Sequence, residues 1–135
     1  MFEVKINYVR QTGEDNPGTV KETYLVDGAT PSDAEKCLIE EIKPFIFGES
    51  EVPVVRKRNF FEIFPNAGGA NWYESKVEIV TVDGEVEKRR SVAFLVQADD
   101  IADGLALLKK NLHSYDCEIL SIKKSAIIDV LYATK

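Results

Sequence analysis

Residue types that carry metal or redox chemistry are scarce in this 135-residue chain, which has two cysteines and one histidine. With one histidine and no Cys-x-x-Cys spacing, the donors of a structural zinc site are missing. Cys37 and Cys117 are interpreted as reduced, small apolar side chains. No apolar run approaches the roughly 18 residues of a membrane span. We therefore expect no metal, no cofactor and no membrane segment.

Basic side chains are fewer than acidic ones: 17 Lys and Arg against 23 Asp and Glu give a net charge of −6. Non-specific duplex binding needs many basic side chains to displace the counterions around phosphates, so the charge balance argues against a nucleic-acid partner. The alternating, charged start of the chain does not resemble a secretory signal. With 44% hydrophobic and 30% charged residues, the composition predicts a globular, cytoplasmic protein.

The sequence indicates an internal repeat, in which the second half of the chain resembles the first. Residues 2–9 align with 73–80, then 24–42 with 94–112, and finally 61–64 with 128–131. Three similar segments in the same order indicate a duplication. The predicted halves are residues 1–64 and 72–135, joined by a linker at 65–71.

Each half is predicted to run strand, strand, helix, strand. The first strand alternates, with its apolar residues on one face: Phe2, Val4, Ile6 and Tyr8. Asp83-Gly84 predicts a tight hairpin between Lys76–Val82 and Lys88–Gln97, whereas the first half has a polar loop at 11–18. The third strands are expected at Pro53–Phe64 and Cys117–Tyr132.

Capping residues mark the start of both helices. Thr30 precedes Pro31 and Asp33, and Asp100 precedes Asp103 in the same way. Pro44 should end the first helix. The apolar helix faces are expected at Ala34, Leu38, Ile42 and at Ile101, Leu105, Leu108, Leu112.

These elements predict an α+β fold in which the two repeats are related by a pseudo-two-fold axis. Six strands would form one mainly antiparallel sheet, or two abutting three-stranded sheets, with both helices on one face. In each repeat the third strand should pair with the first, which keeps the crossover right-handed. The uncovered sheet face would then display Leu25, Leu95 and either Phe61 and Ile63 or their neighbours, a patch typical of a homodimer or a protein-partner interface.

Few side chains suggest catalysis. His113, the single histidine, is interpreted as a capping or solvent-exposed residue at the end of the second helix. Glu62 and Asp129 occupy matching strand positions, where solvated carboxylates are more common than an acid–base pair. The aromatic pairs Trp72-Tyr73 and Phe60-Phe61 could stack bases but are better explained as core. No catalytic residue is assigned.

Basic positions that recur in both repeats are the candidate ligand-binding residues. They could form a two-fold-related basic surface that holds a nucleotide, or they could be solvated strand lysines. The six positions are Lys5, Lys76, Arg56, Lys57, Lys123 and Lys124.

Short segments of the chain resemble an uncharacterised family, domain-of-unknown-function family 4494 of Bacteroidetes bacteria and their phages and mobile elements. The resemblance lies in Tyr24-Leu25-Val26-Asp27, in the segment Glu40–Ile46, in Trp72–Val77 and in Leu95–Ala98, and it spans nearly the whole chain. It implies a phage-related setting and transfers no functional residues.

Two functions stay open from the sequence. The first is a non-catalytic binding or interaction protein that acts on a protein partner or on itself. The alternative is a small-ligand protein that binds or sequesters a nucleotide signal.

Overall fold

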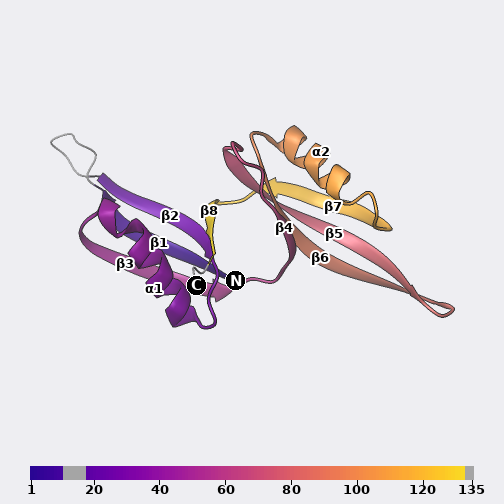
Figure 1. The fold of residues 1–135 in the computed structure, drawn as a ribbon, viewed down its shortest axis with the longest axis horizontal. Helices are drawn as coiled ribbons and strands as arrows, with labels where there is room; N and C mark the ends of the chain where they lie inside the picture. Colours follow the sequence, from indigo (N-terminus) through magenta and orange to yellow (C-terminus); the bar gives the residue numbers. More distant parts are fainter. Residues whose placement is uncertain (11–17, 133–135) are drawn as a thin grey trace. The chain divides into compact units, whose positions relative to one another are not determined.

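A computed structural model describes residues 1–10 and 18–132. The side chains of Arg10 and Phe47 are not described, and the expected polar loop lies outside the described residues except for Gly18. The strands are β1 Phe2–Arg10, β2 Gly18–Val26, β3 Ile46–Lys57, β4 Phe60–Phe64, β5 Asn71–Asp83, β6 Val86–Ala98, β7 Cys117–Lys124 and β8 Ile127–Leu131. The helices are α1 Pro31–Ile42, the short 3-10 helix η1 Lys43–Phe45, and α2 Ile101–Asn111 (Figure 1).

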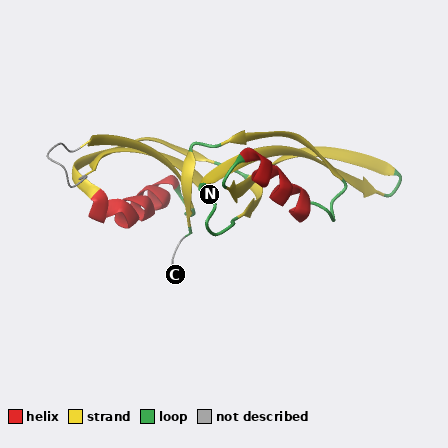
Figure 2. Cartoon of the chain, turned by 90° about the horizontal axis from the view of Figure 1, so that it is seen from above, coloured by secondary structure: helices red, strands yellow, loops and turns green. Residues whose placement is uncertain are grey.

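The strands form two four-stranded mixed sheets, so the α+β class is confirmed. Their strand orders are β3-β1-β2-β8 and β4-β6-β5-β7. The expectation of six strands is wrong, because the described residues form eight, and each helix packs on its own sheet (Figure 2). The predicted pairing of third strand with first is confirmed, since β3 pairs with β1 and β7 with β5, both antiparallel.

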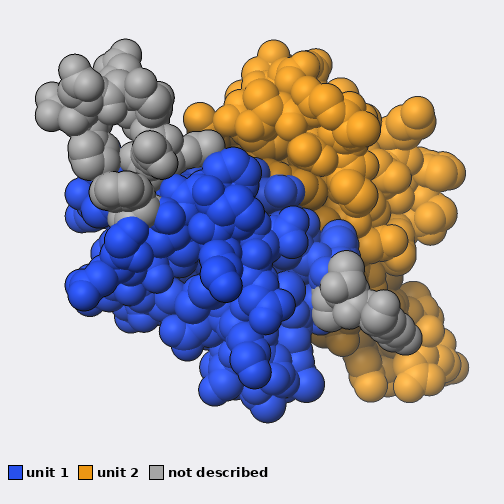
Figure 3. Space-filling model, turned by 60° about the vertical axis from the view of Figure 1, so that its left-hand side comes forward, with its two compact units in different colours: residues 1–58, 126–135 blue, residues 59–125 orange. Residues whose placement is uncertain are grey.

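The chain divides into two compact units that do not coincide with the halves of the sequence. Unit 1 contains residues 1–58 and 126–135, and unit 2 contains residues 59–125 (Figure 3). Each predicted third strand is broken in two, and its last segment joins the sheet of the other half. Thus β8 pairs in parallel with β2, and β4 pairs in parallel with β6.

Local signals for helix starts are confirmed. The Asp33 amide donates to Thr30 Oγ1 at 3.1 Å, and the Asp103 amide donates to Asp100 Oδ1 at 2.8 Å. Each bond satisfies one amide that the first helical turn leaves without a helical partner. Helix α1 ends at Ile42, followed by the 3-10 turn at Pro44.

The predicted hairpin is also confirmed, with one correction. Strands β5 and β6 pair as far as Asp83 and Val86, which leaves Gly84 and Glu85 as the two-residue loop. Gly84 has a φ of 65°, and no non-glycine residue in the described chain has a positive φ. The predicted turn at Asp83-Gly84 is therefore one residue too early, because Asp83 ends the strand and pairs with Val86.

The core of unit 1 lies between α1 and one face of β1 and β2, as the alternation predicts. Its buried side chains include the four apolar residues of β1 together with Tyr24, Val26, Ala34, Leu38 and Ile42. In unit 2, Leu108 and Leu112 of α2 pack on Val77, Ile79 and Phe94. Ile101 is 49% exposed, so its place on the helix stripe is wrong.

Of the expected exposed patch, Phe61 is 43% exposed, but Leu25 and Leu95 are fully buried. The neighbouring short strands explain part of this: Val130 of β8 lies beside Leu25, and Ile63 of β4 lies beside Leu95. The predicted topology keeps each third strand whole within its own half, so it does not include this cover.

The expected linker is tied to unit 2 rather than forming a free hinge. Gln97 Nε2 donates to the Gly69 carbonyl and Gln97 Oε1 accepts from the Asn66 amide, both at 3.0 Å. The Ala70 amide donates to Asp99 Oδ1 at 3.1 Å. Asn71 already belongs to β5.

Candidate functional site

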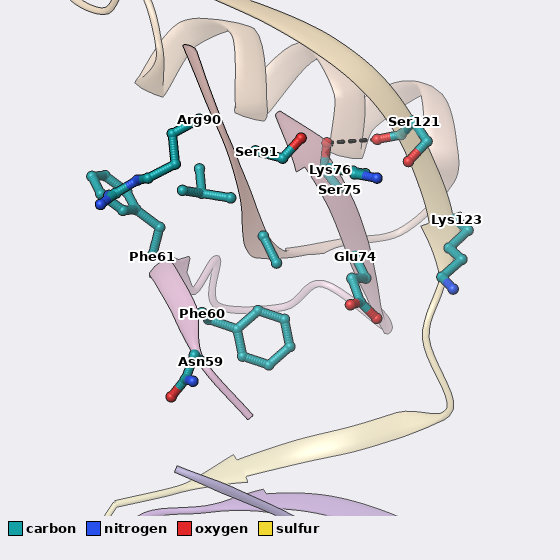
Figure 4. Close-up of a pocket in the computed structure, with 12 residues that line it drawn as sticks. Asn59, Phe60, Phe61, Glu74, Ser75, Lys76, Arg90, Ser91, Ser121 and Lys123 are labelled. Atoms are coloured by element: carbon teal, nitrogen blue, oxygen red, sulfur yellow. Dashed lines mark hydrogen bonds between the residues drawn. The ribbon is translucent and has the colours of Figure 1, made fainter. Parts of the chain in front are cut away.

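A cavity of about 610 Å³ opens on unit 2, on the sheet face opposite α2. Alternation places Tyr73, Val77 and Ile79 of β5 toward the helix, so Glu74 and Lys76 face away from it. The strands on either side contribute Ser91 and Ala93 from β6 and Ser121 and Lys123 from β7. At the β4 edge the cavity is bounded by Phe60, Phe61 and Arg90 (Figure 4).

Lys76 and Lys123 are brought together at this cavity by strand register. Lys123 lies directly opposite Glu74, and Lys76 lies opposite Ser121. Residues directly opposite on neighbouring strands project to the same face. Within residues 1–10 and 18–132, neither lysine has a carboxylate oxygen within ion-pair distance. Their ammonium groups are therefore available to an anion.

Next to the lysines, the cavity offers hydroxyl and aromatic groups. Ser75 is buried and donates its hydroxyl to the Ser121 carbonyl at 2.7 Å, which joins β5 to β7 behind the cavity. Phe60 and Phe61 lie at the β4 edge, and the Arg90 guanidinium carbon is 5.5 Å from the centroid of the Phe61 ring. The site thus combines cations with aromatic rings, as nucleotide sites do.

Two other predicted residues, Lys5 and Arg56, belong to the corresponding face of unit 1. Arg56 lies opposite Glu3 in the β1–β3 register, and its Nε is 2.8 Å from Glu3 Oε2. Arg58 Nη1 is 3.0 Å from Glu3 Oε1. Glu3 is 6% exposed, so these ion pairs compensate a buried carboxylate. Arg56 therefore has a structural partner.

The last two predicted residues, Lys57 and Lys124, lie on the helix-facing sides of their sheets. Lys57 is opposite Phe2, whose side chain points into the α1 core. Lys124 is opposite Tyr73, which contacts the α2 side. The six basic positions are thus divided three to each unit, and only Lys76 and Lys123 line the cavity.

The interpretations of the single histidine, the two strand carboxylates and one of the two aromatic pairs as non-catalytic residues agree with the structure. His113 is exposed, and its Nδ1 lies 2.7 Å from the Lys110 carbonyl at the end of α2. Glu62 and Asp129 are both exposed on short strands, one in each unit. Trp72 and Tyr73 are buried. Phe60 and Phe61 instead border the cavity, which sequence reasoning missed because no local signal marks β4 as an edge strand.

Both cysteines are free and pack at the edge of a core. Burial raises the pKa of the Cys37 thiol, helped by nearby Glu41 and Glu40, and burial together with Asp116 raises that of Cys117. Neither thiol is activated as a nucleophile. No cluster of three or more metal-binding side chains forms in the part of the chain that the structure describes.

The family of the chain is established by its sequence match. The family described as "Domain of unknown function (DUF4494)" matches residues 1–133. The chain belongs to the DUF4494 family. No curated protein matches this DUF4494 chain. Neither of its described α-helices has the length and apolar character that a bilayer span requires.

Proposed function

We propose that this DUF4494 protein is a non-catalytic binding protein that holds a small anionic ligand of the nucleotide class in the unit 2 cavity. The single observation that carries the proposal is the pair Lys76 and Lys123, free of ion pairs among the described residues, at a cavity of about 610 Å³. Small-molecule sites have volumes of roughly 300–1,000 Å³. Lysine ammonium groups bind phosphate as point charges.

The remaining groups of the cavity fit the same ligand class. A base could stack on Phe60, and the Ser91 hydroxyl offers a hydrogen bond to a ribose or base edge. His113 does not line this cavity, so the one histidine is not placed to act on a ligand there. This supports binding or sequestration rather than turnover.

A duplication origin and a phage or mobile-element setting belong to the same proposal. The registers support duplication, since Phe2 lies opposite Val26 and the aligned Tyr73 lies opposite Val96. The exchanged strands follow the same alignment, with Tyr24 beside Asp129 and Phe94 beside Glu62. We expect aligned Cα atoms of the two repeats to superpose within roughly 3 Å.

Calorimetric titration with ATP, a cyclic dinucleotide and pyrophosphate tests the ligand proposal. We expect at least one nucleotide to bind, and Lys76→Gln combined with Lys123→Gln to weaken binding by about ten-fold or more, since each removes a charge-assisted contact. Lys5→Gln is the matched control, because Lys5 is a strand lysine on the corresponding face of unit 1, and it should leave the affinity unchanged. Absence of binding of all three anions at millimolar concentration, or equal losses in variant and control, would overturn the proposal.

Protein binding is the second candidate. Of the side chains on which the homodimer and protein-partner hypotheses rested, Leu25 and Leu95 are buried, whereas Phe61 is 43% exposed. Phe61 together with Tyr115, which is 38% exposed, favours a protein-binding surface on unit 2.

A further inference from the structure

The β5–β6 hairpin extends past the rest of its sheet as a two-stranded ribbon (Figure 1). The last β5–β7 pair is Ile79 with Cys117, whereas β5–β6 pairing continues to Asp83 and Val86. The Val80 amide donates to the Asp116 carbonyl at 2.8 Å, which ties the loop after α2 to the base of the ribbon. A groove of about 770 Å³ lies in this corner.

Two aromatic rings form an apolar wall of the groove. Phe61 makes edge-to-face contacts with Phe94 at 5.4 Å and with Tyr115 at 6.3 Å between ring centroids. Phe94 is fully buried, so it anchors Phe61, while Phe61 and Tyr115 remain partly open to solvent. Ile79, which is 7% exposed, also lines the groove. Rigid, partly exposed aromatics of this kind are typical anchor positions for a partner side chain.

The charged residues of the groove differ in how far they are already paired. Arg89 binds Glu78 at 3.0 Å and Glu87 at 3.3 Å. Lys88 has only a 4.0 Å contact to Asp83, and both side chains are largely exposed. Arg90 stacks on Phe61 and has no carboxylate partner among the described residues. Because stacking uses the face of the guanidinium group, its N–H donors at the edge remain open to a ligand.

We propose that this groove binds a peptide segment of a partner protein that carries an aromatic or large aliphatic side chain next to one or two carboxylates. The apolar side chain would pack on Phe61 and Tyr115, and a carboxylate would pair with Arg90 and Lys88. Charge complementarity selects this occupant over a nucleic acid. Three carboxylates lie along the ribbon, at Asp83, Glu85 and Glu87, and Asp116 lines the groove itself, so a polyphosphate backbone would be repelled. A single carboxylate of a peptide ligand, by contrast, can pair with the Arg90 guanidinium group alone.

Two-dimensional amide NMR on the full chain tests the proposal and detects binding as weak as millimolar. The probe is the hexapeptide Ser-Asp-Phe-Glu-Leu-Ser. One comparison peptide has Asn and Gln in place of the two carboxylates, and the other has Ala in place of Phe and Leu. We expect the first peptide to shift amides of residues 79–90 and 114–116, and each comparison peptide to bind about ten-fold or more weakly, the factor that corresponds to one lost charge-assisted or anchor contact.

Variants separate the groove from the rest of unit 2. Arg90→Gln and Tyr115→Ala should each weaken binding of the first peptide by about ten-fold, and Lys124→Gln, an exposed strand lysine that does not line the groove, should not. Thermal melts check that the variants stay folded, and Tyr115→Phe, which keeps the ring, should retain binding.

Three results would overturn the proposal: no shifts at millimolar peptide, equal binding of all three peptides, or a single-stranded oligonucleotide that occupies the same amides more tightly. Failure here leaves the nucleotide proposal standing, because that test uses Lys76 and Lys123, which lie outside this groove.

Discussion

The two units use one cross-strand position in different ways. In unit 1, Glu3 lies opposite Arg56, and guanidinium groups from Arg56 and Arg58 bind the buried carboxylate. In unit 2, the same position pairs Glu74 with Lys123, which forms no ion pair within the described residues, and a cavity opens beside it. Arginine satisfies a carboxylate with a planar fork of donors, whereas lysine is a mobile point charge. The same strand register therefore gives an ion-paired sheet face in unit 1 and a face with a cavity and an unpaired lysine in unit 2, among the described residues.

The helix-facing sides of the two sheets differ as well. In unit 1, the hydroxyls of Tyr8 and Tyr24 both donate to Glu22 Oε1, the second at 3.3 Å. The aligned residues of unit 2 are Ile79, Phe94 and Val92, all apolar. Unit 1 thus holds a polar cluster where unit 2 has only apolar packing, which makes unit 1 the unit more sensitive to charge and pH.

The largest expected effect comes from removing the strand that unit 1 receives from the second half of the chain. A chain that ends at Ser125 loses β8 and with it Ile127, which is 2% exposed. We expect a loss of about 3 kcal/mol or more in unfolding free energy, from lost burial and an opened β2 edge. In hydrogen exchange, β1 and β2 amides should lose protection while β5 and β6 keep theirs. Equal loss in both units would contradict the exchanged-strand topology.

A smaller loss is expected from breaking the ion pairs of unit 1. Glu3→Gln removes the buried carboxylate that binds the Arg56 and Arg58 guanidinium groups at 2.8 Å and 3.0 Å. We expect the unfolding free energy, measured by urea denaturation, to fall by about 3 kcal/mol at most, because breaking a buried ion pair is costly. Lys123→Gln is the matched change in unit 2 and should cost less than about 0.5 kcal/mol, as surface substitutions do. Similar losses for both would remove the contrast between the two faces.

The helix caps should respond equally in the two units. Thr30→Ala and Asp100→Ala each remove one side-chain bond to the first helical turn. We expect each to lower the unfolding free energy by about 1 kcal/mol. Denaturant melts check this, with Thr30→Ser as the variant that keeps the hydroxyl. No loss in either alanine variant would mean that the caps do not stabilise the helices.

The smallest effect is a pH dependence that belongs to unit 1. Burial, and next the Glu22 carboxylate, raise the pKa of Tyr24 well above its usual range. In the unfolded chain Tyr24 ionises near pH 10, whereas in the folded protein it stays protonated at that pH. The contribution of the protonated hydroxyl to the unfolding free energy is therefore complete below pH 10 and is lost as the pH rises further. At pH 11 we expect the wild type to have lost about 1 kcal/mol more of its unfolding free energy than Tyr24→Phe. Denaturation curves from pH 9 to 11 measure this, and parallel curves for the two proteins would contradict it.

Several features of the fold could be predicted from neighbouring residues. The hairpin around Gly84 and the caps at Thr30 and Asp100 involve contacts across two or three residues, so the sequence pattern specifies them directly. The pairing of β1 with β3 followed from topology rules for a strand-helix-strand connection. The lysines of the cavity were predicted only as members of a larger basic set, and four of the six proved to lie elsewhere.

By itself, the sequence determined the α+β class, the capped helices, the alternation that faces Glu74 and Lys76 away from α2, and membership of DUF4494. Only the tertiary structure decided that β4 and β8 join the sheets of the opposite halves, which buries Leu25 and Leu95 and places Phe60 at the cavity. The physical reason is that parallel partners such as Phe60 and Ala93 are distant in the chain and have no turn between them. Their pairing depends on which sheet edge is open once the other strands have formed, and no local pattern records that choice.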